Sequence, residues 1–193
     1  MKHPVLITGT TSGLGLCLSD KFEKEGHRVF RHKGRAHHDL SSLSEIKDLA
    51  KDAREFGVKI LINNAAITCP SITLEDYNID LIEQMVNVNL MAPILLSYLL
   101  IEDLVDVINI NSMVGLEIKK PRTLYSATKW GLRGFSESFK AENSSINMLD
   151  VYPTNIKTRP DRENAMDIDM VVNKIYQSFV NKDKKLILDG RKK

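Results

Sequence analysis

The feature that most constrains the fold is a short apolar run followed directly by a glycine-rich loop and an amphipathic stretch. Val5-Leu6-Ile7 predicts a β-strand, and Thr8-Gly-Thr-Thr-Ser-Gly-Leu-Gly15 follows it. Apolar residues then recur at helical spacing as far as Gly26, which ends the predicted helix. Strand, glycine loop and helix in this order are typical of an anion-binding unit in an α/β sheet.

Each glycine of the loop has a separate physical role in such a unit. Gly9 permits the tight turn, Gly13 lets the backbone approach a pyrophosphate, and Gly15 lets the helix pack closely on the sheet. The spacing is Gly-x-x-x-Gly-x-Gly, whereas the commoner dinucleotide loop is Gly-x-Gly-x-x-Gly. A glycine-rich turn without a ligand is the competing interpretation.

Helical and strand patterns alternate along the rest of the chain, which predicts one α/β domain over residues 1–193 with a doubly wound, mostly parallel sheet. Ser42-Leu-Ser-Glu45 predicts a capping box at the start of the second helix, and Gly57 ends it. Further strands are predicted at 28–32, 59–62, 105–111, 146–152 and 185–188, and further helices at 81–100, from Tyr125 to Ala141, and at 167–181.

A possible reactive group follows the predicted strand 105–111. Tyr125 and Lys129 are four residues apart on a helix, so the phenol and the ammonium share one face. A phenol titrates near ~10, and a neighbouring cation lowers that pKa, which makes the tyrosine a usable proton donor and acceptor. Ser112 ends the strand and could hold the oxygen that receives the proton. Tyr-x-x-x-Lys alone is common on solvated helices, so the prediction depends on a nucleotide site beside it.

Together these motifs resemble the short-chain dehydrogenases/reductases, over residues 4–158. The glycine loop resembles the family's cofactor loop, and Ser112, Tyr125 and Lys129 stand at the family's catalytic positions with its usual interval. Met85-Val-Asn-Val-Asn89 resembles the family's central helix. The resemblance implies a fourth catalytic residue at Asn89, which supports a backbone distortion and a proton path. It also implies hydride transfer between a nicotinamide cofactor and a small carbonyl or alcohol.

The resemblance implies cofactor contacts along most of the chain. Asn63-Asn-Ala-Ala66 resembles the family's Asn-Asn-Ala-Gly, and Pro153-Thr-Asn-Ile-Lys-Thr158 resembles Pro-Gly-x-Ile-x-Thr. Ala66 and Thr154 therefore replace glycines of the family. The implied cofactor-binding residues are Gly9, Thr11, Ser12, Gly13, Leu14, Gly15, His32, Lys33, Arg35, Asp39, Leu40, Asn63, Asn64, Ala65, Tyr125, Lys129, Pro153, Ile156 and Thr158.

The end of the second strand favours NADP(H) over NAD(H). Family members that use NAD often carry an acid there, which binds the ribose hydroxyls. This chain has His32, Lys33 and Arg35 instead, and a cationic pocket would suit a 2′-phosphate. The competing interpretation is that the same residues form a basic turn exposed to solvent, which binds no cofactor.

The chain is shorter than the family pattern in two places. A parallel crossover needs a dozen or more residues, and none fits between Lys33 and Asp39. We therefore expect that one crossover helix is missing and that the third strand is short or lost. The substrate cover, residues 159–166, is also short, so we expect an open site in the monomer. Since relatives commonly pair the helices around Asn89 and Tyr125, we expect a homodimer or homotetramer.

Composition excludes few functions. A net charge of +2 without a dominant basic patch gives no support for nucleic-acid binding, and the run 90–101 is too short to span a bilayer. Cys17 and Cys69 show no metal spacing, and no signal peptide is expected, so we expect a cytoplasmic protein without metal. A catalytically idle NADP-binding sensor or scaffold, and a sugar epimerase or dehydratase with tightly held NAD, are the competing functions.

Overall fold

The computed structural model describes residues 2–68, 72–158 and 165–191 of the 193. Its centre is a six-stranded sheet in the order β2-β1-β3-β4-β5-β6, in which every neighbouring pair is parallel. The strands are β1 Val5–Ile7, β2 Val29–Arg31, β3 Ile60–Asn63, β4 Asp106–Ile110, β5 Asn147–Pro153 and β6 Lys185–Leu188. The predicted doubly wound α/β fold with a mostly parallel sheet is confirmed.

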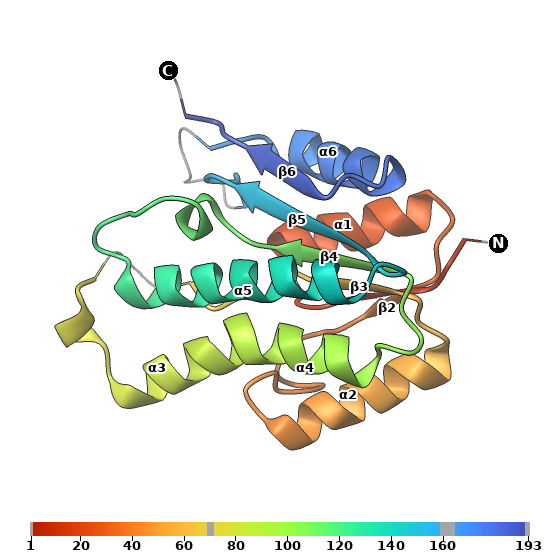
Figure 1. Cartoon of the computed structure of the whole chain (residues 1–193), viewed down its shortest axis with the longest axis horizontal. Coiled ribbons are helices and arrows are strands. Elements are labelled where there is room, and N and C mark those ends of the chain that lie inside the picture. Colours follow the sequence, from red (N-terminus) through yellow and green to blue (C-terminus); the bar gives the residue numbers. More distant parts are fainter. Residues whose placement is uncertain (1, 69–71, 159–164, 192–193) are drawn as a thin grey trace.

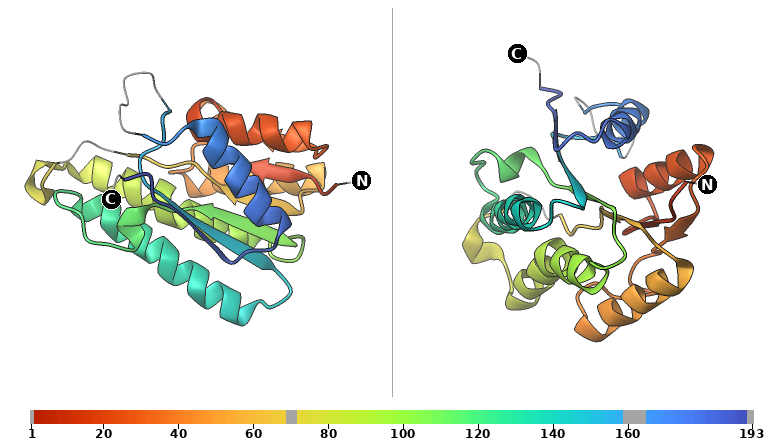
Figure 2. Two further views of the ribbon diagram at one scale, coloured as in Figure 1. Left: turned by 90° about the horizontal axis from the view of Figure 1, so that it is seen from above. Right: turned by 45° about the vertical axis from the view of Figure 1, so that its right-hand side comes forward.

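Helices cover both faces of the sheet (Figure 1). On one face lie α1 (Gly13–Lys24) and α6 (Ile168–Val180), and on the other lie α2 (Leu43–Phe56), α4 (Ala92–Leu99) and α5 (Thr123–Glu142). Successive strand residues point to opposite faces, so Leu6 joins the core below α2 and α4, while Ile7 joins the core below α1 and α6. The right-hand view of Figure 2 shows the helices on the two sides of the sheet.

The connection after β2 is as short as the sequence predicts. A turn at Gly34, whose φ is +81°, leads within a few residues to α2, and no described strand pairs with the outer side of β2. Only half of the predicted capping box forms. The Ser42 hydroxyl accepts from the Glu45 N–H at 3.5 Å, but the Glu45 carboxylate accepts from the backbone N–H of Asp39. Glu45 therefore fixes the short connection rather than the cap residue.

The predicted helix 81–100 is a composite. It consists of α3 (Ile79–Val86), a π-helical segment (Asn87–Met91) and α4. By length and composition, Ile79–Leu99 could cross a membrane, and 28% of its most apolar window is buried within this chain. A helix that packs against a sheet can have the same length and apolar composition, and α4 packs in this way here.

Candidate active site

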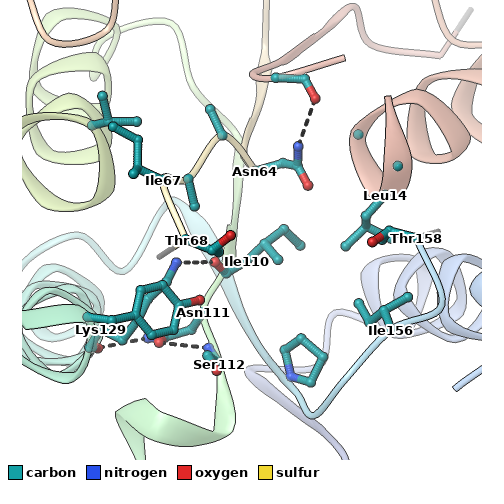
Figure 3. Close-up of a pocket in the computed structure, with 18 of the residues that line it drawn as sticks. Leu14, Asn64, Ile67, Thr68, Ile110, Asn111, Ser112, Lys129, Ile156 and Thr158 are labelled. Atoms are coloured by element: carbon teal, nitrogen blue, oxygen red, sulfur yellow. Dashed lines mark hydrogen bonds between the residues drawn. The ribbon is translucent and has the colours of Figure 1, made fainter. Parts of the chain in front are cut away.

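A cavity of about 740 Å³ opens at the carboxyl ends of the strands, a size suited to a small-molecule ligand. The glycine loop and the start of α1 form one side, and the end of β4 and the start of α5 form the other. Figure 3 shows Leu14 and Thr158 facing the group of Asn111, Ser112 and Lys129 across this space. The glycine loop and the candidate reactive residues therefore share one site.

The glycine loop has the backbone conformation that its glycines predict. Gly9 and Gly13 have φ of +70° and +57°, values that favour glycine over residues with a Cβ. A Cβ on Gly15 would lie 2.1 Å from the Gly9 carbonyl oxygen and 2.4 Å from Asn64 Nδ2. Only glycine at position 15 allows α1 to approach the loop so closely.

The loop is braced by the residues that follow β3. Asn64 Nδ2 donates to the carbonyl oxygens of Thr8 at 2.8 Å and Gly9 at 3.1 Å. In return, Thr8 Oγ1 accepts from the backbone N–H groups of Asn64 at 2.9 Å and Ala65 at 3.0 Å. The neighbouring Asn63 is buried and donates to Asn109 Oδ1 at 2.8 Å, so its side chain braces the sheet.

The start of α1 fits the pyrophosphate of a dinucleotide. Ser12 is the N-cap residue, yet no side chain caps the helix, and its first turn contains no acidic residue. The first N–H groups of a helix need partners and carry partial positive charge, so an anion in the cavity would satisfy them. The residues present therefore fit a nicotinamide dinucleotide, whose phosphates Ser12, Gly13 and Leu14 would hold.

Lys129 lies on α5 and is 2% exposed. Its Nζ donates to the backbone oxygen of Ile110 at 2.9 Å and lies 5.8 Å from the centroid of the Tyr125 ring. Burial disfavours the charged form and lowers the pKa of Lys129 to about 8. The ammonium is therefore held near the phenol, as the spacing predicts, but at a cost in solvation.

Asn111 joins the end of β4 to α5 and holds Ser112 in place. Its Oδ1 accepts from the Ser112 N–H at 2.9 Å, and its Nδ2 donates to the Lys129 carbonyl oxygen at 3.2 Å. A Cβ on Gly115 would lie 2.6 Å from Asn111 Oδ1, so this glycine makes room for the contact. Sequence reasoning missed Asn111, although its position just before Ser112 at the strand end was a usable signal.

Asn89 lies behind the cavity wall rather than in it. It is buried in the π-helical segment, where its Oδ1 accepts from the Ile67 N–H at 2.7 Å and its Nδ2 donates to the Ile67 oxygen at 2.9 Å. The side chain thus ties the distorted turn to the segment after β3. This backbone distortion is the one that the family resemblance implies at Asn89.

The end of the cavity near β2 is less cationic than the sequence suggests. His32 accepts from the Gly9 N–H at Nδ1 and donates from Nε2 to the His38 oxygen, at 3.2 and 2.8 Å. Burial also lowers the pKa of His32, so its ring is neutral. Lys33 is exposed outside the cavity, whereas Arg35 lines it and forms an ion pair with Asp39 at 2.8 Å.

The opposite wall comes from the end of β5. Pro153, Ile156 and Thr158 line the cavity, and Thr154 Oγ1 accepts from the Gly190 N–H at 2.9 Å. Ile156 pairs with Met166 in an isolated parallel bridge. Residues 159–164 of the predicted short cover at 159–166, and Cys69, lie outside the described residues.

The structure brings together most of the residues that the sequence predicts for the site. Lys33, Asn63 and Asn89 do not line the cavity. The predicted residues that do are Gly9, Thr11, Ser12, Gly13, Leu14, Gly15, His32, Arg35, Asp39, Leu40, Asn64, Ala65, Ser112, Tyr125, Lys129, Pro153, Ile156 and Thr158. Sequence reasoning missed further lining residues, among them Ile67, Thr68, Val88, Ile110, Lys119, Arg122 and Arg191. Within the described ranges no cluster of His, Cys, Asp and Glu could hold a metal.

Known proteins share both this sequence pattern and this fold. The model of the short chain dehydrogenase family matches residues 3–169. Sorbitol-6-phosphate 2-dehydrogenase of Klebsiella pneumoniae is 26% identical over 197 residues, which cover 84% of this chain and 73% of that protein.

Two dehydrogenases of known structure show the same fold. The bulky-bulky ketone specific alcohol dehydrogenase of Comamonas testosteroni has a TM-score of 0.85 at 24% identity, with 96% of this chain and 86% of that chain covered. A short-chain dehydrogenase of Sphingobium yanoikuyae in complex with NADPH has a TM-score of 0.81 at 21% identity, with 96% and 87% covered. Because the family model spans the glycine loop and the Ser-Tyr-Lys residues in one match, this chain belongs to the short-chain dehydrogenase family of oxidoreductases.

Proposed function

We propose that the protein interconverts a carbonyl compound and an alcohol with NADP(H), using Tyr125 as the general acid and base. The observation that carries this proposal is that Ser112, Tyr125 and Lys129 line the same cavity as the glycine loop. A dinucleotide on that loop would extend toward the Tyr125 side, where a carbonyl could sit beside it. The cofactor supplies hydride transfer when bound.

The chain's own residues would then manage the proton. In the reducing direction Tyr125 gives its phenolic proton to the substrate oxygen, and the Ser112 hydroxyl donates a hydrogen bond to the same oxygen. The charged form of Lys129 favours the phenolate that Tyr125 becomes. Asn111 positions Ser112 relative to α5, and Asn89 holds the segment after β3 that forms the adjoining wall.

The test is turnover by Tyr125→Phe, which removes only the phenolic oxygen. Loss of a general acid commonly costs about 10²–10⁴ in rate, so we expect kcat to fall by that amount while cofactor affinity changes little. Tyr98→Phe, at an exposed position of α4, makes the same chemical change away from the cavity and serves as the control. Turnover by Tyr125→Phe at the parent rate would refute the role of Tyr125. Cofactor binding without turnover of any carbonyl would favour an idle binding protein.

The preference for NADP(H) rests on Arg35 in this proposal. Arg35 is the cation of the predicted basic turn that lines the cavity, and a guanidinium suits a phosphate better than a ribose hydroxyl. The structure of the Sphingobium yanoikuyae relative was solved in complex with NADPH, which accords with this choice. Asp39 shares Arg35, so the ion pair must open or rearrange when a 2′-phosphate arrives.

A homodimer through α4 and α5 is the proposed assembly. Tyr98 on α4 is 69% exposed, Met91 before it 39% and Trp130 on α5 44%. Large apolar side chains on neighbouring helices favour an interface, and the low burial of Ile79–Leu99 within the chain has the same explanation. Light scattering at micromolar concentration tests the assembly, and a monomer at that concentration would contradict it.

A further inference from the structure

We infer that the substrate carries an anionic group, a phosphate or a carboxylate, which Arg122 and Lys119 bind at the mouth of the cavity. The inference rests on the proposed carbonyl–alcohol function and adds the chemical class of its substrate. Both cations line the same cavity as Tyr125, so a molecule whose oxygen reaches Tyr125 can contact them with its other end.

Arg122 is placed by the helix that carries Tyr125. It is the N-cap residue of α5, three residues before Tyr125, and its guanidinium carbon lies 5.9 Å from the centroid of the Tyr125 ring. Lys119 belongs to the connection between the turn after Ser112 and α5, and its side chain is exposed at the mouth. An anionic group bound there would belong to the far end of the substrate, away from the carbonyl carbon that receives hydride.

Neither cation has a carboxylate partner among the described residues. Arg122 and Lys119 form no ion pair there, and the buried Arg122 Nε donates no hydrogen bond. Arg31 contacts two carboxylates and Arg54 contacts Asp103, whereas Arg28 and Arg133, like Arg122, lie over an aromatic ring. A partly buried guanidinium without an acceptor is costly, and an anionic ligand would remove that cost.

The remaining charges at the mouth do not neutralise this pair. Glu117 lines the cavity, but its carboxylate is bound by Arg191, which also contacts Asp189. Among the described residues, the cavity wall at this end therefore has three cations, Lys119, Arg122 and Arg191, and one carboxylate, while Asp189 contacts Arg191 from outside the wall. Helix α5 adds no acidic residue in its first turn, so its dipole also favours an anion. With Arg191 held by two carboxylates, Lys119 and Arg122 remain as the described cations that an anion could bind.

The test compares matched pairs of substrates that differ only in the anion. Dihydroxyacetone phosphate is compared with dihydroxyacetone, fructose 6-phosphate with fructose, and 4-oxopentanoate with 2-pentanone, by NADPH consumption. We expect the parent to prefer the anionic member of at least one pair, and the phosphate and carboxylate arms show which anion is bound. A charge-assisted hydrogen bond contributes enough that Arg122→Gln should reduce the preference roughly 10- to 100-fold.

Three further variants make the result specific. Lys119→Gln should reduce the preference about two- to tenfold, because its exposed ammonium is screened by salt. Arg122→Lys keeps the charge and should retain part of the preference. Lys120→Gln removes the adjacent exposed charge, which does not line the cavity, and should leave the preference as in the parent. The ratio within each pair is the readout, so a general loss of rate does not affect it.

A second measurement does not require turnover. Inorganic phosphate is titrated calorimetrically into the NADP⁺-saturated protein, in which the cofactor occupies the glycine loop. Binding should weaken in Arg122→Gln and Lys119→Gln but not in Lys120→Gln. A preference for neutral substrates in the parent, or an anion preference that survives both Gln variants, overturns the inference while the proposed function stands. Absence of turnover with every member of every pair counts against the proposed function itself.

Discussion

Lys129 should make the folded protein less stable at neutral pH than a variant without the charge. Burial lowers the pKa of Lys129 from 10.5 to about 8. Since one pKa unit corresponds to about 1.4 kcal/mol, the protonated side chain costs the folded state about 3 kcal/mol at pH values below the folded pKa. Lys129→Met removes that cost and loses one hydrogen bond to Ile110, worth about 1 kcal/mol.

The sign of the pH dependence follows from linkage. Between about pH 8 and 10.5 the unfolded chain holds the Lys129 proton and the folded chain does not, so the stability of the parent rises with pH in that window. We therefore expect Lys129→Met to be more stable than the parent by about 2 kcal/mol at about pH 6.5. The two proteins should be nearly equal at about pH 9.5, a change of about 2 kcal/mol in the difference.

Urea denaturation of both proteins without cofactor, at the two pH values, measures this change. Lys174→Met is the matched control, since it removes an exposed ammonium from α6 on the other face of the sheet. Titrating groups away from Lys129 are common to the compared proteins and cancel in the difference. A stability difference that stays the same at both pH values would refute the buried, cation-destabilising environment of Lys129.

Three further changes probe other parts of the site. Gly15→Ala should lower the free energy of unfolding by roughly 1–3 kcal/mol or more and weaken cofactor binding, because the new Cβ would lie 2.1 Å from the Gly9 oxygen. Urea denaturation measures the loss of stability, and a fluorescence titration measures the cofactor affinity. Arg35→Ala should reduce the preference for NADP(H) over NAD(H) about tenfold or more. Lys33→Ala should reduce it less, because Lys33 lies outside the cavity. Equal effects of the two variants would disprove the assignment of the 2′-phosphate contact to Arg35. Trp130→Glu should shift the light-scattering mass from dimer to monomer, and an unchanged mass would place the interface elsewhere.

Local sequence patterns predicted the helices and strands of this fold, and they also predicted the glycine loop and the Tyr125–Lys129 pair of the site. The glycine loop depends on backbone conformations that only glycine adopts easily, so Gly9 and Gly13 could be identified from the sequence alone. The helical spacing of Tyr125 and Lys129 is equally local. The missing crossover was visible as a simple shortage of residues between Lys33 and Asp39.

Features that depend on distant segments could not be predicted in the same way. The bond between Asn111 and the Lys129 carbonyl forms only where β4 meets α5. The neutral state of His32 depends on two backbone groups that the glycine loop and the short turn bring to its ring. Similarly, Arg191 reaches the cavity because β6 lies beside β5, which no pattern near Arg191 reveals. The spacing of residues along the chain carries no information about such contacts between distant segments.

The missing crossover also leaves β2 as an outer strand whose far side has no partner among the described residues. An open strand edge can pair with the edge of another molecule and start aggregation. Here β2 has only three residues, and Arg31 within it is bound to Asp20 and Glu23, which places charges beside the edge. Short length and charge are common protections of such edges. Loss of the charge at Arg31 would therefore leave the short length of β2 as the remaining protection of this edge, which limits how the strand can change in evolution or engineering.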